Sequence, residues 1–552
     1  MLTPRIVSDQ TRTLTLDGRH LALASLANAA VGRSDVAVSD ESEVIDRVAS
    51  AAALVAAAVA DGKKIYGVTT GFGGMADEAI PCDLAAVSQS NLLNFLAAGA
   101  GEPIDDRHTR AAMLLRANVL LQGCSGARLE LIQRLVAFVH ADAIPVVREL
   151  GSIGASGDLI PLASIARAIT GADAKVRYKG QTTSAKEVLS SLGLQPLQLL
   201  PKEGLALING TSFSAAIAAN VVAEAQRLFA LTVGVQSMML RALVAHVEPF
   251  GDFVHQKKPH AGQVWVARVM KDLLTKGATP TTKPSAAVQD RYSLRCLPQY
   301  LGPIAEGIAR AAATVETEMN SVSDNPLVDV ESGGFHQSGN FLGQYIAISM
   351  DEMRQHIGLM AKHLDVQLAT LVTPEFSGGL PASLRGNSER PYNMGLKGLQ
   401  ITANSIMPML TWHGNPITTH FPTHAEQYNQ NINGLSWGSA NLAWRSIKLF
   451  RQYLATSLIA AVQACDLRAK EIHGNFDGRQ MLGPLNQPLY EAVCQVTGVA
   501  AGEGKPFLFD DSDRSLESDL ESLASDIELE GDLCFAVENI ERSFESHFDR
   551  TS

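Results

Sequence analysis

The chain is 552 residues long, and 46% of its residues are hydrophobic while 18% are charged. This length and composition allow more than one domain and a large buried core, and they exclude wholesale disorder. The formal net charge of -12, without any run of lysine and arginine, argues against nucleic acid as a partner. The six cysteines are far apart and form no CxxC pair, so neither a disulfide framework nor a zinc motif is expected.

The first residues contain no apolar segment of the kind that secretory signals carry. The longest apolar stretch, residues 228–240, is shorter than the roughly 20 helical residues that cross a bilayer. We therefore expect this stretch to be a buried helix. The sequence predicts a cytoplasmic protein with reduced thiols and no membrane partner.

Long helices dominate the predicted elements. A first helix begins near Asp40, where Asp40 and Glu43 suggest a capping box, and it ends at Asp61-Gly62. The segments 212–247, 303–320 and 434–467 contain few helix-breaking residues. Between the last two, apolar residues recur at three-, four- and seven-residue steps, which predicts one apolar stripe on a long helix. Its members are Leu342, Ile346, Met353, Ile357, Met360, Leu364 and Leu368.

Several long helices with apolar stripes must bury those stripes against one another, which predicts a helix bundle. Strand signals are sparse, so the fold class is mainly α. We place a domain boundary near residue 205, where mixed α/loop sequence gives way to long helices. Residues 1–205 would form a smaller N-terminal domain, and residues 206–552 the central bundle with a peripheral, acidic helical segment at its end.

The glycine-rich segment GSIGASGDLIPLA (151–163) admits two interpretations. In one, a tight turn leads into a helix that Ser156 or Asp158 caps. In the other, the Gly157 amide nitrogen attacks the Ala155 carbonyl carbon, because glycine has no side chain in the way and tolerates unusual dihedrals. Loss of two waters would then leave a ring with a methylene at Ser156, which is an electrophile. The segment by itself does not decide between the two.

Seven further segments accompany the tripeptide, in this order: IYGVTTGFGG (65–74), KEGLALINGTS (202–212), QDRYSLRCLPQYLGP (289–303), NSVSDNPL (320–327), GNFLGQY (339–345), GLKGLQI (395–401) and HAEQYNQNIN (424–433). With them, the sequence from about residue 60 to 470 resembles the aromatic amino-acid ammonia-lyases and aminomutases, and most of all the shorter bacterial and cyanobacterial phenylalanine ammonia-lyases. The resemblance implies the long-helix, fumarase/aspartase-like fold of the histidine and phenylalanine ammonia-lyases. It also implies a 4-methylidene-imidazol-5-one (MIO) formed from Ala155, Ser156 and Gly157, no external cofactor, no metal, and a homotetramer with shared active sites.

The same resemblance implies roles for single residues. Tyr66 would be the base that removes the β-proton, which requires that its pKa of about 10 be lowered or its phenolate be stabilised locally. Arg295 would hold the substrate carboxylate, a task that suits the two parallel hydrogen bonds of a guanidinium. Tyr292, one helical turn earlier, would support the electrophile. Asn209, Gln289 and Asn325 match positions around the ring and the substrate, and Pro326 would keep Asn325 out of the α region.

Further pocket positions are Phe341, Lys397, Glu426, Asn429 and Gln430, for which core packing or solvent exposure is the structural alternative. Glu426 and Gln430 are four residues apart and would share a face if their segment is helical. The carboxylate of Glu426 would bind or relay the proton of the substrate ammonium. His420 and His424 have a spacing that can bind zinc, but no third ligand is evident, so no metal is expected.

The substrate is inferred from Phe95-Leu96, which matches the selectivity position of the family. Two apolar side chains cannot satisfy a phenol or an imidazole, and an unpaired buried polar group costs about 1–3 kcal/mol. We therefore expect L-phenylalanine as substrate, trans-cinnamate and ammonia as products, and Gln430 in place of a glutamate agrees with this. Asn94 and Gln337-Ser338 depart from the family pattern and bear on the shape of the pocket.

Several alternatives stay open at this stage. A phenylalanine 2,3-aminomutase shares all of these residues, and a tyrosine or histidine ammonia-lyase differs mainly at Phe95 and Gln430. A catalytically dead homologue would be expected to lack Ser156 or Tyr66. A fumarase-type lyase would carry a GSxxMPxKxN loop, which the sequence does not contain.

Overall fold

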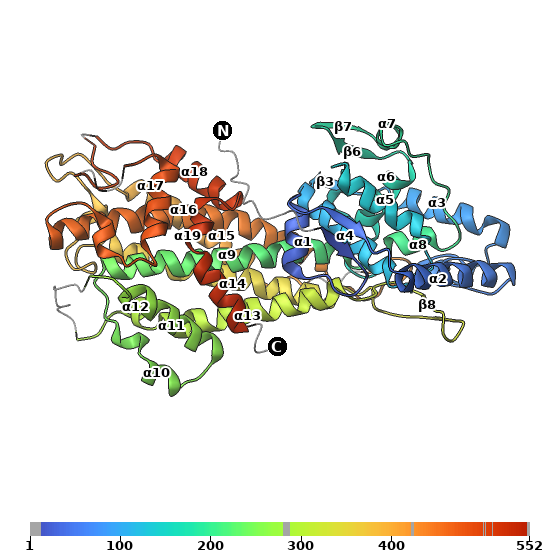
Figure 1. Cartoon of the computed structure of the whole chain (residues 1–552), viewed down its shortest axis with the longest axis horizontal. Helices are drawn as coiled ribbons and strands as arrows, with labels where there is room; N and C mark the ends of the chain where they lie inside the picture. The colour runs from blue at the N-terminus through green and yellow to red at the C-terminus, as the bar shows by residue number, and fades with distance from the viewer. Residues whose placement is uncertain are drawn as a thin grey trace.

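A computed structural model describes residues 13–279, 288–420, 424–500, 502, 504–510 and 512–548. Its centre is a bundle of long helices that run along the longest axis of the molecule (Figure 1). These helices are α9 (Ser212–Ala242), α11 (Ala261–Thr275), α13 (Leu297–Met319), α14 (Gln344–Leu371), α15 (Lys397–His413) and α16 (Ser436–His473). The long-helix bundle predicted from the apolar stripes is confirmed.

Helix α9 forms the middle of the bundle. It packs against α16, α4, α13 and α14, and almost every one of its side chains is buried. By length and composition it is the one helix in the described part of the chain that could cross a membrane, yet 89% of its most apolar window is buried inside the protein. The buried helix expected at 228–240 is therefore confirmed, although the helix extends well beyond that stretch.

Two details of the predicted helices are wrong. Helix α2 (Ser42–Ala60) ends before Asp61 as expected, but its N-cap is Glu41, which makes no side-chain capping bond. Asp40 and Glu43 are therefore out of phase for a capping box. Helix α14 begins at Gln344, so Leu342 precedes it, whereas the other members of the predicted stripe are buried.

The N-terminal part of the chain consists of short helices with short strands between them, at one end of the bundle (Figure 1). The helices are α1 (Leu23–Ala30), α2, α3 (Ala85–Phe95), α4 (Asp106–Leu121), α5 (Leu129–His140), α6 (Leu159–Thr170), α7 (Ala185–Ser191) and α8 (Glu203–Ile208). The domain boundary predicted near residue 205 falls inside α8, and it stays a prediction.

The strands are two to four residues long and form small, separate sheets. They are β1 (Leu14–Leu16), β2 (Val36–Val38), β3 (Ala100–Pro103), β4 (Ile144–Pro145), β5 (Arg148–Leu150), β6 (Lys175–Tyr178), β7 (Gln181–Ser184), β8 (Leu327–Asp329) and β9 (Gly334–His336). β1 and β2 are parallel, with Leu14 opposite Val36, while β3–β5, β4–β6–β7 and β8–β9 are antiparallel. These sheets tie loops together and do not form a core layer.

The remaining helices cover the bundle. They are α10 (Asp252–Gln256), α12 (Tyr292–Arg295), α17 (Gln487–Thr497), α18 (Glu517–Glu528), α19 (Asp532–Ala536) and α20 (Glu538–Phe548). α18 packs on α16, and α20 packs on α9. The acidic C-terminal segment is thus helical and peripheral, as the sequence predicted.

Candidate active site

Ala155, Ser156 and Gly157 lie in the loop between β5 and α6. Ala155 and Gly157 are buried, whereas Ser156 is half-buried, so only the middle residue reaches an open space. The backbone of Gly157 has φ +71°, and a Cβ added there would lie 2.1 Å from the carbonyl oxygen of Gly210. Only glycine fits this position, because it alone adopts the left-handed region without strain and has no Cβ to clash.

The helix-cap interpretation of this loop is right about the position of Asp158 but wrong about its hydrogen bond. The N-cap of α6 is Asp158, but its side chain makes no capping bond to α6. Instead, its carboxylate accepts a hydrogen bond of 2.7 Å from the Ser214 amide in the first turn of α9 and one of 3.1 Å from the Ser152 hydroxyl. Burial raises the pKa of Asp158 to about 6, against the hydrogen bonds from Ser214 and Ser152. The carboxylate thus anchors the tripeptide loop to the central helix.

Segments far apart in the sequence hold the tripeptide from several sides. The Asn209 side-chain amide donates a 3.0 Å hydrogen bond to the Ser156 carbonyl, and the Asp158 amide donates one of 2.8 Å to the Gly210 carbonyl. The Gln430 side-chain amide donates a 3.0 Å hydrogen bond to the Ser156 hydroxyl. The side chains of Asn209 and Gln430 thus both contact Ser156, and their role in binding stays a prediction.

Tyr66 sits near this cluster in a glycine-rich turn. The Gly73 amide donates a 2.9 Å hydrogen bond to the Tyr66 hydroxyl, and this bond favours the phenolate. Burial nevertheless raises the pKa of Tyr66, and the nearby Glu426 carboxylate raises it further. The pKa of Tyr66 is therefore not lowered in this chain. Local stabilisation of the phenolate depends on the hydrogen bond from the Gly73 amide.

The segment with Glu426, Asn429 and Gln430 is a turn, so the helix considered for it is wrong. Glu426, Gln427 and Tyr428 have φ values of +52°, +52° and +65°, and Ala425 pairs with Gln430 across the turn. The turn still brings the side chains of Glu426 and Gln430 into hydrogen-bond contact. Burial raises the pKa of Glu426, against this hydrogen bond. Asn429 is exposed.

Asn325 and Phe341 lie in neighbouring loops. Asn325 is buried, and its side-chain oxygen accepts a 2.7 Å hydrogen bond from the Ser338 amide. The Asn325-Pro326 peptide bond is cis. Phe341 is half-buried just before α14, and the Gly343 amide donates a 3.3 Å hydrogen bond to the Gly154 carbonyl in the tripeptide loop.

Phe95 and Leu96 lie at the end of α3, a helix that contacts both α6 and α8. Leu96 is 7% exposed, whereas Phe95 is 54% exposed. The Phe95 ring faces Phe72 of the Tyr66 turn, with 6.5 Å between ring centroids. Phe95 thus lies beside the Tyr66 turn, whereas Leu96 is packed in the hydrophobic core.

Four predicted site residues lie far from the tripeptide in the same chain: Gln289, Tyr292, Arg295 and Lys397. Helix α12 contacts α14 through Gln367, whose side-chain amide donates a 2.8 Å hydrogen bond to the Ser293 carbonyl. At about 1.5 Å of rise per residue, α14 spans roughly 35 Å from Gln344 to this point. Figure 1 likewise shows α12 and α8 at opposite ends of the molecule.

The distant group has a consistent internal arrangement. The Arg295 guanidinium lies over the Tyr292 ring, 4.7 Å from its centroid, and Tyr292 is 72% exposed. The Arg295 Nε is buried and has no hydrogen-bond partner among the described residues. Lys397 is exposed at the start of α15. The amide of its neighbour Leu396 donates a hydrogen bond to the Ser383 carbonyl. The carbonyl of the next residue, Leu384, accepts a hydrogen bond from the Gln463 side chain of α16, so the start of α15 lies near Gln463.

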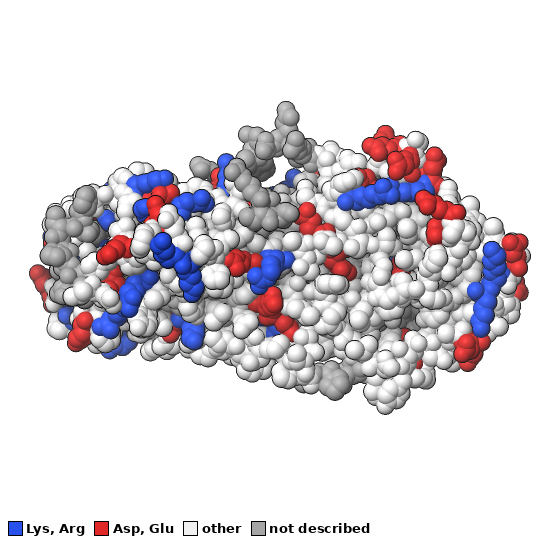
Figure 2. Space-filling view, turned by 90° about the horizontal axis from the view of Figure 1, so that it is seen from below, with Lys and Arg blue, Asp and Glu red and all other residues white. Residues whose placement is uncertain are grey.

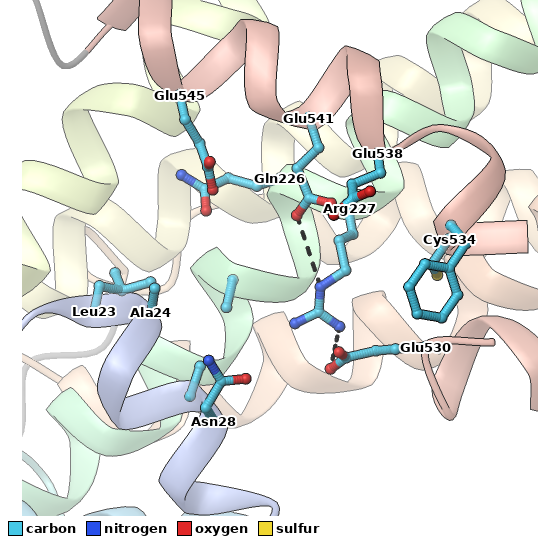
Figure 3. Close-up of a pocket in the computed structure, with 13 residues that line it drawn as sticks. Leu23, Ala24, Asn28, Gln226, Arg227, Glu530, Cys534, Glu538, Glu541 and Glu545 are labelled. Atoms are coloured by element: carbon cyan, nitrogen blue, oxygen red, sulfur yellow. Dashed lines mark ion pairs between the residues drawn. The ribbon is translucent and has the colours of Figure 1, made fainter. Parts of the chain in front are cut away.

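A separate cavity of about 310 Å³ lies between α1, α9, α19 and α20 (Figure 3). Glu530, Glu538, Glu541 and Glu545 line it around Arg227, which forms ion pairs with Glu530 at 2.5 Å and Glu541 at 3.8 Å. Arg227 is about 22 Å along α9 from Ser212 by helix rise. The cavity is therefore far from the tripeptide, and its acidic lining would repel the carboxylate of an amino acid. For both reasons it is no candidate for the amino-acid site.

Among the described residues, no group of three or more His, Cys, Asp and Glu side chains is arranged to hold a metal ion. His424 stacks on Tyr428, with ring centroids 4.2 Å apart.

Sequence reasoning missed the anchoring role of Asp158 and the part that Gly210 and Gly73 play. The local sequence indicates Asp158 only as a cap for the helix that follows it. Its true partner, Ser214, lies 56 positions further along the chain, so no local pattern shows it. Both glycines belong to the glycine-rich motifs of the sequence. Only the packing shows that Gly210 contacts the Gly157 backbone and that the Gly73 amide donates a hydrogen bond to Tyr66.

The fold and this cluster together define a class of enzyme, and the comparisons with known proteins agree. Residues 21–494 match the family model described as aromatic amino acid lyase. The chain is 47% identical to a phenylalanine ammonia-lyase of Nostoc punctiforme over 97% of this chain and 95% of that protein. It is 41% identical to an aromatic ammonia-lyase of Loktanella atrilutea over 97% of this chain and 99% of that protein.

Among solved structures, a phenylalanine aminomutase of Pantoea agglomerans superimposes with a TM-score of 0.85 at 28% identity, over 95% of this chain and 100% of that one. The chain belongs to the aromatic amino acid lyase family. It is a carbon-nitrogen lyase of the aromatic ammonia-lyase type, and the predicted family and fold are confirmed.

Proposed function

We propose that this enzyme eliminates ammonia from L-phenylalanine to give trans-cinnamate, with an MIO group formed from Ala155, Ser156 and Gly157. One observation carries the proposal: Gly157 is locked in a left-handed conformation against Gly210, while the Ser156 side chain faces Gln430. This packing holds Gly157 in place and leaves the middle side chain partly accessible.

The residues present fit the group. The Gly157 nitrogen would bond to the Ala155 carbonyl carbon, and the Ala155 oxygen would leave as water with the amide hydrogens of Ser156 and Gly157. Ser156 would lose its hydroxyl and its α-hydrogen as a second water. The ring would supply an electrophilic methylene at residue 156, which no ordinary side chain offers.

The surrounding side chains divide the work of the elimination. Tyr66 takes the proton from the substrate β-carbon, and the Gly73 amide stabilises the phenolate that does so. Glu426, whose pKa burial raises, faces Tyr66 and is placed to accept a proton from the substrate ammonium. The amides of Asn209 and Gln430 hold residue 156 on two sides.

We propose that the site is completed by other copies of the chain in a homotetramer. Arg295, Tyr292, Gln289 and Lys397 cannot reach Ser156 within one chain, because roughly 35 Å of α14 separates the two groups. Exposed large apolar side chains on the long helices support this, among them Tyr345 and Ile348 on α14 and Trp412 on α15. On the face seen in Figure 2, charged side chains are sparse over a broad area on the right. Large exposed apolar side chains that gather on one surface mark protein contacts.

Phenylalanine is proposed over tyrosine because Phe95 and Leu96, which would line the substrate pocket, offer no partner to a phenol hydroxyl. At about 1–3 kcal/mol for an unpaired polar group, tyrosine would be disfavoured by roughly tenfold or more. The similarity to the Nostoc phenylalanine ammonia-lyase supports the same substrate. The similarity to the Pantoea aminomutase keeps a 2,3-aminomutase as the second candidate.

The test is to incubate the purified protein separately with phenylalanine, tyrosine and histidine, and to follow both the unsaturated acid and any β-amino acid. We expect cinnamate from phenylalanine as the main product. Accumulation of β-phenylalanine would favour the aminomutase, and no turnover of any of the three would refute the proposal. The intact mass should be lower than that of the sequence by two waters, and Ser156→Ala should abolish both this loss and turnover.

The shared site is tested by complementation. Ser156→Ala and Arg295→Ala should each be inactive alone. When the two are co-expressed, hybrid tetramers should contain some sites with both native residues and regain part of the activity. Co-expression of two Ser156→Ala chains with different tags is the matched control. A complete lack of recovery in purified hybrids would contradict the shared site.

A further inference from the structure

The strongest unassigned feature near the tripeptide is a buried ion pair beneath it. Lys202 Nζ lies 2.9 Å from Asp324 Oδ2, and both side chains are 0% exposed. Lys202 also has φ +75°, the left-handed conformation that favours glycine, at the start of α8. A buried ion pair is a poor source of stability compared with apolar packing, and backbone strain concentrates at functional sites. Both features point to a positional role.

The ion pair joins two segments that hold the catalytic loop. The segment 202–211 contains Asn209, which bonds to Ser156, and Gly210, which bonds to Asp158. The segment 323–325 abuts it a second time at Ser323, whose hydroxyl accepts a 3.3 Å hydrogen bond from the Thr211 amide. A Cβ added to Gly210 would lie 2.2 Å from the Ser323 carbonyl oxygen. The two segments therefore pack with no room for adjustment.

The same carboxylate orients a second site residue. Asp324 Oδ1 accepts a 2.7 Å hydrogen bond from the Asn325 amide. The Ser338 amide donates to the Asn325 side chain, and the Ser338 hydroxyl donates a 2.8 Å hydrogen bond to the Asp324 carbonyl. Ser338 is one of the residues at which this sequence departs from the family pattern. Asp324 is thus the junction between the Asn209 side and the Asn325 side of the site.

We propose that the Lys202–Asp324 ion pair positions the residues that close the ring at Ala155-Ser156-Gly157. The pair fixes segment 202–211 against segment 323–325, and it thereby keeps Gly210 in contact with Gly157. This inference rests on the proposed MIO function. Ring closure needs the Gly157 nitrogen within about 3–3.5 Å of the Ala155 carbonyl carbon. Loss of the ion pair frees Gly210 to move away from Gly157, so the Gly157 nitrogen is no longer held in one position relative to Ala155.

Arg116 decides which variant to use. Its guanidinium is a second buried cation beside Asp324, and it donates a hydrogen bond to the Ala206 carbonyl. Removal of Asp324 alone would therefore leave two buried cations without their carboxylate. Lys202→Met is the milder change, because Arg116 still faces the carboxylate and methionine fills most of the lysine volume.

The experiment measures three quantities on each purified protein: the fraction of chains that have lost two waters by intact mass, kcat and KM for phenylalanine, and the melting temperature. The matched control is Arg451→Met. Arg451 Nη2 lies 2.9 Å from Glu224 Oε1, and the side chains are 3% and 5% exposed, but Glu224 lies about 18 Å along α9 from Ser212.

For Lys202→Met we expect a minority of dehydrated chains and a kcat lower by roughly a hundredfold, the scale of a 1 Å misplacement. KM should change less than kcat, because Lys202 does not touch the substrate. Arg451→Met should be dehydrated like the wild type, whatever its melting temperature. The double variant Lys202→Met/Asp324→Asn removes both charges of the pair but leaves Arg116 without its carboxylate. Its melting temperature should therefore stay below that of the wild type, and its dehydrated fraction should stay low.

Wild-type dehydration and kcat in Lys202→Met would overturn the inference and leave the proposed function intact. So would a double variant that recovers ring closure together with stability, since the pair would then only balance charge. Failure of both variants to fold while Arg451→Met folds would also overturn it, because the pair would then be required by the fold itself. Absence of dehydration in the wild type would instead refute the proposed function.

Discussion

Gly157→Ala tests the bend of the tripeptide most directly. The new Cβ would lie 2.1 Å from the Gly210 carbonyl oxygen, whereas carbon and oxygen normally approach to about 3.3 Å. The two backbones must separate by about 1.2 Å, which breaks the 2.8 Å hydrogen bond from the Asp158 amide to that oxygen. A lost buried hydrogen bond costs about 1–3 kcal/mol, and alanine in the left-handed region adds about 1–2 kcal/mol.

The sum is a loss of about 2–5 kcal/mol in the free energy of unfolding, measured by urea denaturation at one fixed protein concentration. Gly180→Ala is the matched control, because Gly180 has φ +75° but nothing within 4 Å of an added Cβ. It should cost only the backbone strain of about 1–2 kcal/mol. Gly157→Ala should also keep the full mass of its sequence and lose turnover. Equal destabilisation of the two variants, with two waters still lost from Gly157→Ala, would refute the proposed contact.

Three further predictions follow from the site. Tyr66→Phe should lower kcat/KM by about a hundredfold or more. In the wild type, kcat/KM should rise with pH into the alkaline range, since the base is the deprotonated tyrosine and burial raises the pKa of Tyr66. The same rise of kcat/KM with pH in Tyr66→Phe would exclude Tyr66 as the base. The pKa of Asp158 is raised from 3.8 to about 6, so the folded state binds this proton more tightly than the unfolded state. The free energy of unfolding should therefore fall by about 3 kcal/mol as the pH rises from about 4 to 6. Denaturation across this range should show a smaller fall for Asp158→Asn, and identical pH profiles would contradict the assignment. Phe95→His should raise the ratio of tyrosine to phenylalanine turnover by roughly tenfold, since an imidazole can pair with the phenol; an unchanged kcat/KM ratio would show that this position does not select the substrate.

The helices were largely predictable, because their signal is local. The stripe from Ile346 to Leu368 repeats with the period of a helix, and the structure buries these residues against α16 and α13. Helix ends were less predictable, as the misplaced cap of α2 shows. A cap depends on the phase of one or two residues, which a period over many residues does not fix.

The turn at Glu426 shows a different limit. A four-residue spacing is compatible with a helix, but three consecutive left-handed residues, Glu426, Gln427 and Tyr428, form a tight turn instead. The turn packs on the Tyr66 segment: a Cβ on Gly73 would lie 2.0 Å from Glu426 Oε2. Contact between these two segments, far apart in the sequence, outweighs the local spacing.

The sequence by itself determined the family and the long-helix fold, and it suggested the chemistry that we propose for Ala155-Ser156-Gly157, because residue types and their order carry that information. The tertiary structure alone decided that Ser156 is no helix cap, that Gly210 and Asp158 hold the loop, and that burial raises the pKa of Tyr66. It also decided that one chain separates Arg295 from Ser156 by roughly 35 Å of helix. All of these features arise from packing between segments that are distant in the sequence. They depend on exclusion of solvent and on close contact, which the local sequence does not encode.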